Sequence, residues 1–446
     1  MTGIDPLVLV RAVDEVRRAT GDPVVAEMFE RSMAENLPAV AERLPDGTTF
    51  VLTGDIPAMW LRDSAAQLRP YLILCPDDPA LQDVLIGVLH RQLEYIAIDP
   101  YANAFNRSAD GAGHTSDETE MGPWVWERKY EIDSLCYPLE LAYRLWRITG
   151  RDDVIDARFR TAAAAILDLW TVELDHEARS AYRFQRHDEA PTDTLVRDGR
   201  GRLTRPTGMS WSAFRPSDDA TEHGFNVPGN MFASVVLEYL QVIAGEVLGD
   251  EALAARAKDL KAGIDDGIAR YGTVDHPELG PVFAYEVDGL GARLLMDDAN
   301  MPSLLSIPMT GFTGADDPTY LATRQLLLSA ENPYYYSGTH ASGIGSPHTP
   351  AHHIWPIALA VQGLTSTSMA EKRQLLELLR DTTGGTGQMH ESFHCDDPTK
   401  FTREWFSWAN AMFCELALDC AGRTINTRSS RHPTDESQTT SRRRVE

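Results

Sequence analysis

The sequence is poor in cysteine and has none of the marks of a secreted protein. Its 446 residues include five cysteines, which are scattered and form no C-x-x-C pair. This count and spacing exclude a disulfide framework, so we expect reduced thiols. The N-terminus has an acidic residue before its apolar part and no small-residue cleavage site. No signal peptide is therefore expected, and a cytoplasmic location is predicted.

Long apolar runs and basic clusters are also scarce. No apolar run approaches the roughly 20 residues of a membrane span, so no membrane partner is expected. The formal net charge is −25, and a negative surface repels phosphate backbones. Nucleic acid is therefore excluded as an expected partner, and a neutral or cationic substrate is favoured. Phosphate-binding glycine loops, G-x-S-x-G elbows and Cys–His nucleophile patterns are absent from the sequence.

What the sequence does contain is helical periodicity, and strand-like runs are confined to 48–52 and 281–287. Apolar residues recur with a period near 3.6 along most of the chain, which indicates amphipathic helices. We predict helices over 7–20, 24–44, 80–98, 132–148, 153–174, 230–248, 251–271, 319–330, 350–364, 369–381 and 402–421.

Short and long connections alternate between these helices. Gly21-Asp22 and Gly249-Asp250 each end one helix with glycine and open the next with aspartate, as tight helix hairpins do. The long connections are irregular and hold most of the Gly, Pro, His, Asp and aromatic residues outside helices. This alternation predicts helix pairs in a ring, with one tight rim and one rim that builds a site. We expect a single domain over 1–422 and a disordered tail over 423–446.

The segment 53–68, TGDIPAMWLRDSAAQL, combines charge with an aromatic ring at a predicted loop-to-helix junction. Asp55 suits a helix start, and Trp60, Arg62 and Asp63 follow within eight positions. This mixture is typical of a sugar-binding wall. A capped helix with a buried Arg–Asp pair is an equally good interpretation.

Two later segments offer carboxylates for acid–base chemistry. Asp218 and Asp219 lie in the longest loop, where like charge and burial raise one pKa and favour a general acid. Pro-Ser-Asp-Asp is also good turn chemistry. Glu404 lies among four aromatic residues of 401–410 beside Arg403, a setting that desolvates a general base and keeps it ionised. Aromatics at this density more often form core.

A zinc hydrolase is a second functional hypothesis, suggested by His390, Glu391 and His394, which match H-E-x-x-H. That pattern binds zinc only within a helix, and the glycines at 384–387 and Pro398 make a helix here implausible. We therefore expect no metal.

Eight segments, taken together, resemble glycoside hydrolase family 125, the bacterial and fungal exo-α-1,6-mannosidases. They run in order from about residue 24 to 418 and read TGDIPAMWLRDSAAQ, WERKYEIDSL, FRPSDD, NVPGNMFA, DDANMPSLL, SGIGSPHT, GQMHESF and REWFSWANAMF. The resemblance implies an all-α (α/α)6 toroid and inverting removal of terminal α-1,6-linked mannose from an α-mannoside oligosaccharide. It implies no metal and no cofactor.

Carried onto this sequence, the resemblance places the general acid at Asp218 or Asp219, with Asp218 favoured, and the general base at Glu404. The expected substrate-binding residues are Asp55, Trp60, Arg62, Asp63, Glu127, Asp133, Arg215, Asn230, Asn300, Met301, His348, His390 and Trp408. We expect a monomer or a weak homo-oligomer. A non-catalytic carbohydrate-binding toroid and a polysaccharide lyase are competing hypotheses, although an acidic chain suits anionic lyase substrates poorly.

Overall fold

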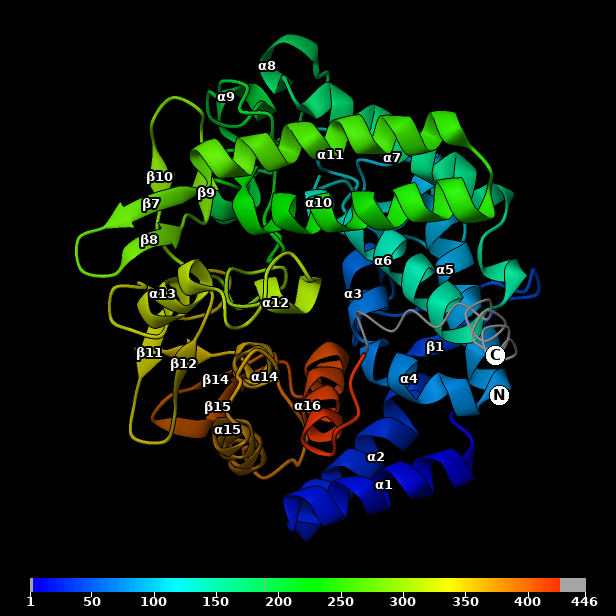
Figure 1. The fold of residues 1–446 in the computed structure, drawn as a ribbon, viewed down its shortest axis with the longest axis vertical. Helices are drawn as coiled ribbons and strands as arrows, with labels where there is room; N and C mark the ends of the chain where they lie inside the picture. Colours follow the sequence, from blue (N-terminus) through cyan, green and yellow to red (C-terminus); the bar gives the residue numbers. More distant parts are fainter. Residues whose placement is uncertain (1–2, 188, 426–446) are drawn as a thin grey trace, which may run out of the picture.

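The computed structural model describes residues 3–187 and 189–425 and consists mainly of helices (Figure 1). Several helices begin at an aspartate whose carboxylate accepts from first-turn amides, as Asp22 and Asp250 do. The α-helices are α1 (Pro6–Thr20), α2 (Pro23–Val40), α3 (Leu61–Ala66), α4 (Arg69–Leu74), α5 (Pro79–Ile98), α6 (Ile132–Thr149), α7 (Ala157–Glu173), α8 (His176–Arg179), α9 (Val196–Gly199), α10 (Val227–Val242), α11 (Glu251–Tyr271), α12 (Ile307–Thr310), α13 (Pro318–Leu327), α14 (Pro356–Leu364), α15 (Met369–Asp381) and α16 (Ser407–Cys420).

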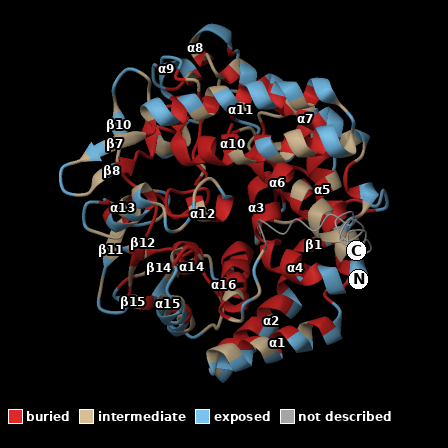
Figure 2. Ribbon diagram, viewed as in Figure 1, coloured by how far each residue is buried: buried red, intermediate tan, exposed pale blue. Residues whose placement is uncertain are grey.

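The helices form an inner and an outer ring. The inner ring contains α3 with α4, α6, α10, α12, α14 and α16, and each follows an outer helix in the chain: α2, α5, α7, α11, α13 and α15. Every residue of α3 and α4 is buried, whereas α11 and α15 bury one stripe each (Figure 2). A helix buried on all sides lies inside the fold, and a helix that buries one stripe lies on its outside. The predicted all-α (α/α)6 toroid of helix pairs is confirmed.

Strands are more numerous than predicted, because short antiparallel ladders build the site rim. The described residues contain β1 (Ala41–Arg43), β2 (Thr49–Val51), β3 (Met59–Trp60), β4 (Ala104–Phe105), β5 (Val125–Glu127), β6 (Phe225–Asn226), β7 (Thr273–His276), β8 (Gly280–Phe283), β9 (Glu286–Val287), β10 (Arg293–Leu294), β11 (Tyr335–Ser337), β12 (Ser342–Ile344), β13 (His353–Ile354), β14 (Ser392–His394) and β15 (Asp397–Thr402).

Two of the three-stranded sheets position the site. One has the order β3-β4-β5 and pairs Trp60 with Ala104, and the other has the order β13-β14-β15 and pairs Phe393 with Phe401. The second sheet shortens two predicted helices. α14 begins at Pro356 rather than 350, and α16 begins at Ser407 rather than 402, because β13 and β15 occupy the residues before them.

One expectation about apolar runs is wrong. Residues Val227–Val247, which comprise α10 and the π-helical turn after it, form a helix of 21 residues with a mean hydropathy of 1.3 over a window of 18, enough by length and composition to span a membrane. In this window 72% of the residues are buried inside the fold. The segment is an inner-ring helix, and the surrounding helices provide its apolar environment.

The first residue of the predicted tail, Arg423, is held by contacts with the fold. Arg423 pairs with Glu15 at 3.1 Å and donates to the carbonyl of Ile73, so the chain is held against α1 and α4 to this point. Residues 426–446 lie outside the described residues.

Candidate active site

A cavity opens where several inner helices begin. About 460 Å³ of space, part of it open to solvent, lies between its lining residues. Trp60, Trp355 and Phe406 line it and are the N-cap residues of α3, α14 and α16. The other lining residues are Thr53, Ile56, Arg62, Asp63, Pro216, Ser217, Asp218, Asn300, His348, Glu391, Arg403 and Trp408. Six predicted binding residues therefore meet here: Trp60, Arg62, Asp63, Asn300, His348 and Trp408.

Arg62 is the electrostatic centre of the cavity. Its guanidinium donates from Nη1 to Glu131 at 2.5 Å and from Nη2 to Asp218 at 3.2 Å. It also lies 3.5 Å from carboxylate oxygens of Asp63 and Asp133. Burial raises the pKa of Asp63 to about 6, and burial likewise raises the pKa of Asp133 to about 6. The expected Arg–Asp pair of segment 53–68 is buried and forms part of the cavity wall. The expected cap is wrong, because α3 has Trp60 at its N-cap position with no side-chain hydrogen bond, and Asp55 pairs with Arg403 instead.

Asp218 is held in a strained turn. Its amide donates to the carbonyl of Arg215 at 2.9 Å, and its φ of 66° lies in the left-handed region. Such conformations in non-glycine residues cost energy and are common at functional sites. Lys129 fixes the turn, because its buried ammonium donates to the Asp218 carbonyl at 2.8 Å and to Asp193 at 2.7 Å.

Asp218 and Asp219 point to different neighbours. The Asp218 carboxylate lines the cavity and accepts from Arg62 and from Asn103 Nδ2 at 3.3 Å. Asp219 is buried behind it and lies 3.3 Å from Nδ1 of His348. Burial acts to lower the pKa of His348, but the hydrogen bond and charge of Asp219, with Asp218 and Glu391, raise it to about 9. Histidine with such a pKa is a cation at neutral pH.

Besides Asp63 and Asp218, the cavity is lined by a third carboxylate, that of Glu391. It is 9% exposed and lies 3.5 Å from Arg403, whose guanidinium also contacts Asp55 and the carbonyl of Thr53. Arg403 stacks over Phe406 with 4.8 Å between its guanidinium carbon and the ring centroid. Sequence reasoning considered Glu391 only as part of a zinc pattern, although it lies within the segment GQMHESF.

The structure corrects the expectation for Glu404. Its side chain is exposed and does not line the cavity, so the predicted desolvation by aromatic rings is wrong. Only its backbone carbonyl has an internal role, accepting from Nδ1 of His390 at 2.6 Å. The β14–β15 hairpin separates Glu391 from Glu404 and directs the former inward.

The remaining predicted binding residues support the cavity from outside. Glu127 accepts from Asn103 at 2.8 Å, and Arg215 donates to Glu286 at 2.6 Å. The Asn230 side chain, on α10, bonds both the amide and the carbonyl of Ser210, and the carbonyl of Met301 accepts from Tyr137. None of these predicted residues lines the cavity, and neither do Asp55, Asp133, Asp219 or His390.

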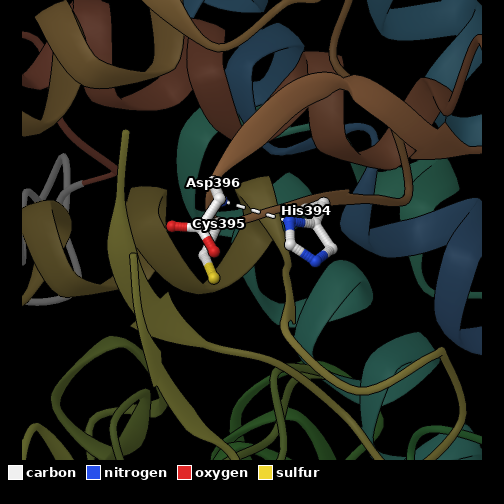
Figure 3. Close-up of side chains that lie close together, drawn as sticks. All are labelled: His394, Cys395 and Asp396. Carbon is white, nitrogen blue, oxygen red and sulfur yellow. Dashed lines mark hydrogen bonds between the residues drawn. The ribbon is translucent and has the colours of Figure 1, made fainter. Parts of the chain in front are cut away.

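The zinc arrangement is not formed by His390, Glu391 and His394. Both ring nitrogens of His390 contact backbone carbonyls, those of Glu404 and Thr383, and the ring stacks on Phe401 at 3.7 Å. His394 ends strand β14 rather than sharing a helix face with His390. Its neighbours are shown in Figure 3, where Nδ1 of His394 accepts from the amide of Asp396 at 3.1 Å. Potential ligand atoms of His394, Cys395 and Asp396 lie within 4.8 Å of one another, outside the cavity.

Known proteins are similar to this chain in sequence along most of its length. A family model described as metal-independent α-mannosidase (GH125) matches residues 22–418. The meiotically up-regulated gene 157 protein of Schizosaccharomyces pombe is 38% identical over 431 residues, covering 92% of this chain and 84% of that protein.

Solved structures extend the comparison. A metal-independent α-mannosidase from Streptococcus pneumoniae, in a non-productive complex with α-1,6-mannobiose, is 50% identical with a TM-score of 0.92. The match covers 95% of this chain and 100% of that one. A glucoamylase from Saccharomycopsis fibuligera, 12% identical with a TM-score of 0.58 over 91% of this chain and 96% of that one, shares the fold alone. The chain is a glycoside hydrolase and belongs to family 125, the metal-independent α-mannosidases.

Proposed function

We propose that this α-mannosidase removes terminal α-1,6-linked mannose from a mannoside and inverts the anomeric carbon. The observation that carries the proposal is that Asp218 and Glu391, from different parts of the chain, line one cavity. Inverting glycosidases need two carboxyl groups, one to protonate the leaving oxygen and one to activate a water on the opposite face of the sugar.

In this proposal Asp218 is the general acid and Glu391 the general base. Asp218 lines the cavity directly, whereas Asp219 is buried behind it against His348. Arg403 lies 3.5 Å from the Glu391 carboxylate and orients it at the cavity wall. Glu391 replaces Glu404 in this role because a base must reach the substrate water.

A blind pocket suits an enzyme that removes terminal residues. Arg69 of α4 bonds Glu415 of α16 through two contacts of 2.8 Å and lies 3.6 Å from Glu140 of α6. This buried cluster links three helices of the inner ring, and we infer that it closes the ring behind the cavity, so that an oligosaccharide enters from one end. The terminal sugar then meets Arg62, Asp63 and Trp408, where charged groups and an indole ring suit hydroxyl and ring-face contacts.

The α-1,6 linkage is supported by the mannobiose bound to the Streptococcus pneumoniae relative. The test is hydrolysis of α-1,2-, α-1,3- and α-1,6-mannobiose, with proton NMR of the first-formed sugar. We expect the α-1,6 isomer to be hydrolysed fastest and to release β-mannose. A first product in the α configuration would rule out inversion, and equal rates on the three isomers would rule out the linkage preference.

A further inference from the structure

Beneath the general acid lies a second carboxyl group that no substrate can touch. The Glu131 side chain has no exposed area and comes from the N-cap position of α6. Its Oε2 accepts from Arg62 at 2.5 Å and from Ser134 Oγ at 2.7 Å. Its Oε1 is buried and accepts from no donor among the described residues. A buried carboxylate oxygen that accepts no hydrogen bond lowers the stability of the fold unless it carries a proton.

Glu131 and Asp218 are joined in two ways. Each carboxyl group acts on the other as a hydrogen-bond partner that raises the pKa of Glu131 and lowers the pKa of Asp218, and such a bond between two carboxyl groups needs one proton. The two outer nitrogens of Arg62 also bridge the pair, Nη1 bonding Glu131 and Nη2 bonding Asp218. Two carboxyl groups that share one cation and contact each other ionise as a unit, because the second charge is much harder to form than the first.

We propose that Glu131 and Asp218 share a single proton, and that Glu131 is a positioning residue which keeps Asp218 able to protonate the leaving oxygen. This inference rests on the proposed role of Asp218 as the general acid. It assigns Glu131 a function distinct from neutralising Arg62, for which three other carboxylates are present.

The surrounding charges agree with one proton in the pair. Burial raises the pKa of Glu131 well above its ordinary value, although Arg62 acts in the opposite direction. Burial also acts to raise the pKa of Asp218, but Arg62, the hydrogen bond from Glu131, Lys129 and His348 lower it. In the resting enzyme the proton therefore resides on the Glu131 side of the shared hydrogen bond.

The other charged groups facing the pair are acidic. Asp133 of α6 and Asp63 of α3 both lie against the same guanidinium. Their negative charges oppose ionisation of Glu131 and Asp218, and so favour retention of the proton.

The proton balance of the reaction follows. As the glycosidic C–O bond breaks, the proton of the pair moves from Glu131 to Asp218, and Asp218 gives it to the leaving oxygen. The attacking water bonds to the anomeric carbon and gives its proton to Glu391. Both carboxyl groups of the pair are then ionised, each facing one nitrogen of Arg62, until the pair regains a proton from solvent and Glu391 releases its own.

The variant Glu131→Gln tests this assignment. The amide keeps an acceptor for Arg62 but removes the shared proton and the like charge that raises the proton affinity of the pair. We expect the alkaline limb of kcat/KM for α-1,6-mannobiose to move down by about one pH unit or more, with about tenfold loss at neutral pH. The rate on 2,4-dinitrophenyl α-mannoside, whose leaving group needs no proton, should stay close to that of the wild type.

Ser134→Ala is a comparison variant whose alkaline limb should not move in the direction expected for Glu131→Gln. It removes a donor that stabilises ionised Glu131, so the alkaline limb should move to higher pH or stay in place. An alkaline limb of kcat/KM that is unchanged in Glu131→Gln would overturn the proposal. Equal losses of rate on α-1,6-mannobiose and on 2,4-dinitrophenyl α-mannoside would also overturn it, provided that Glu131→Gln has the melting temperature of the wild type.

An infrared measurement separates this inference from the proposed function. A carboxylic acid C=O stretch at neutral pH, present in the wild type and missing from the Glu131→Gln spectrum, would support the shared proton whatever the substrate. Its absence from the wild-type spectrum would overturn the proposal. A wild type that releases no mannose but shows this band would refute only the proposed function.

Discussion

Replacing Arg62 by Met is the most direct test of the electrostatics described above. Methionine keeps much of the volume but leaves four carboxyl groups without their shared cation: Asp63, Glu131, Asp133 and Asp218. At 3.5 Å and an effective dielectric constant near 20, one unit-charge pair is worth about 4–5 kcal/mol. Removing one partner of a buried ion pair typically costs about 3–5 kcal/mol. We expect a loss of this size in the free energy of unfolding at pH 8.

The same variant should have a characteristic pH dependence. Asp63 and Asp133 already have folded pKa values of about 6, above the ordinary 3.8, and loss of Arg62 raises them further. A folded state with raised carboxyl pKa values binds protons more tightly than the unfolded chain, so its stability falls as the pH rises from about 4 through the folded pKa. The deficit of Arg62→Met should therefore be largest at pH 8 and shrink towards pH 5.

The assay is urea unfolding followed by tryptophan fluorescence at pH 5 and pH 8. Arg256→Met is the matched control, because Arg256 pairs with Asp168 on the surface, where both side chains are well exposed. That control should change stability by less than about 1 kcal/mol at either pH. A deficit of Arg62→Met that is equal at the two pH values would refute the charge argument and leave only lost packing.

Other variants test the assignments of individual residues. Glu391→Gln should lower kcat by about 10²–10⁴-fold without unfolding the enzyme, whereas Glu404→Gln should retain most of its activity. The reverse result in mannose-release assays would restore Glu404 as the base. Lys129→Met should lower kcat by about 10- to 100-fold with a smaller change in KM, because the strained Asp218 turn loses its anchor. A wild-type kcat in this variant would show that the Asp218 turn keeps its conformation without Lys129.

The helical ring was predictable because its signals are local. The 3.6-residue period identified most helices, and the Gly–Asp junctions identified tight hairpins such as the one at Gly249-Asp250. The short strands were harder to predict, because β13 and β14 pair residues that are far apart in sequence. Long-range pairing leaves little trace in a window of a few residues.

The general base shows why the site was only partly predictable. Glu391 and Glu404 flank one hairpin, and Arg403 lies next to Glu404 in sequence but contacts Glu391 in space. Side chains alternate between faces along a strand, so a register shift of one residue would exchange inward and outward positions. Phe393 paired with Phe401 sets that register here. No local pattern distinguishes the two glutamates, and aromatic neighbours favoured the wrong one.

The position of the cavity in the ring explains why several acidic side chains can be buried around it. Trp60, Trp355 and Phe406 line it as N-cap residues, and Glu131, the N-cap of α6, contacts Arg62 directly behind it. Helix N-termini carry a partial positive charge and unpaired amides, and several of them meet at this point. They add to the charge of Arg62 and lower the cost of burying these acids, although burial still raises the pKa of Glu131 and Asp133. Asp218 is held by a strained loop instead, and in our proposal it depends on Glu131 for the proton that it passes to the leaving oxygen.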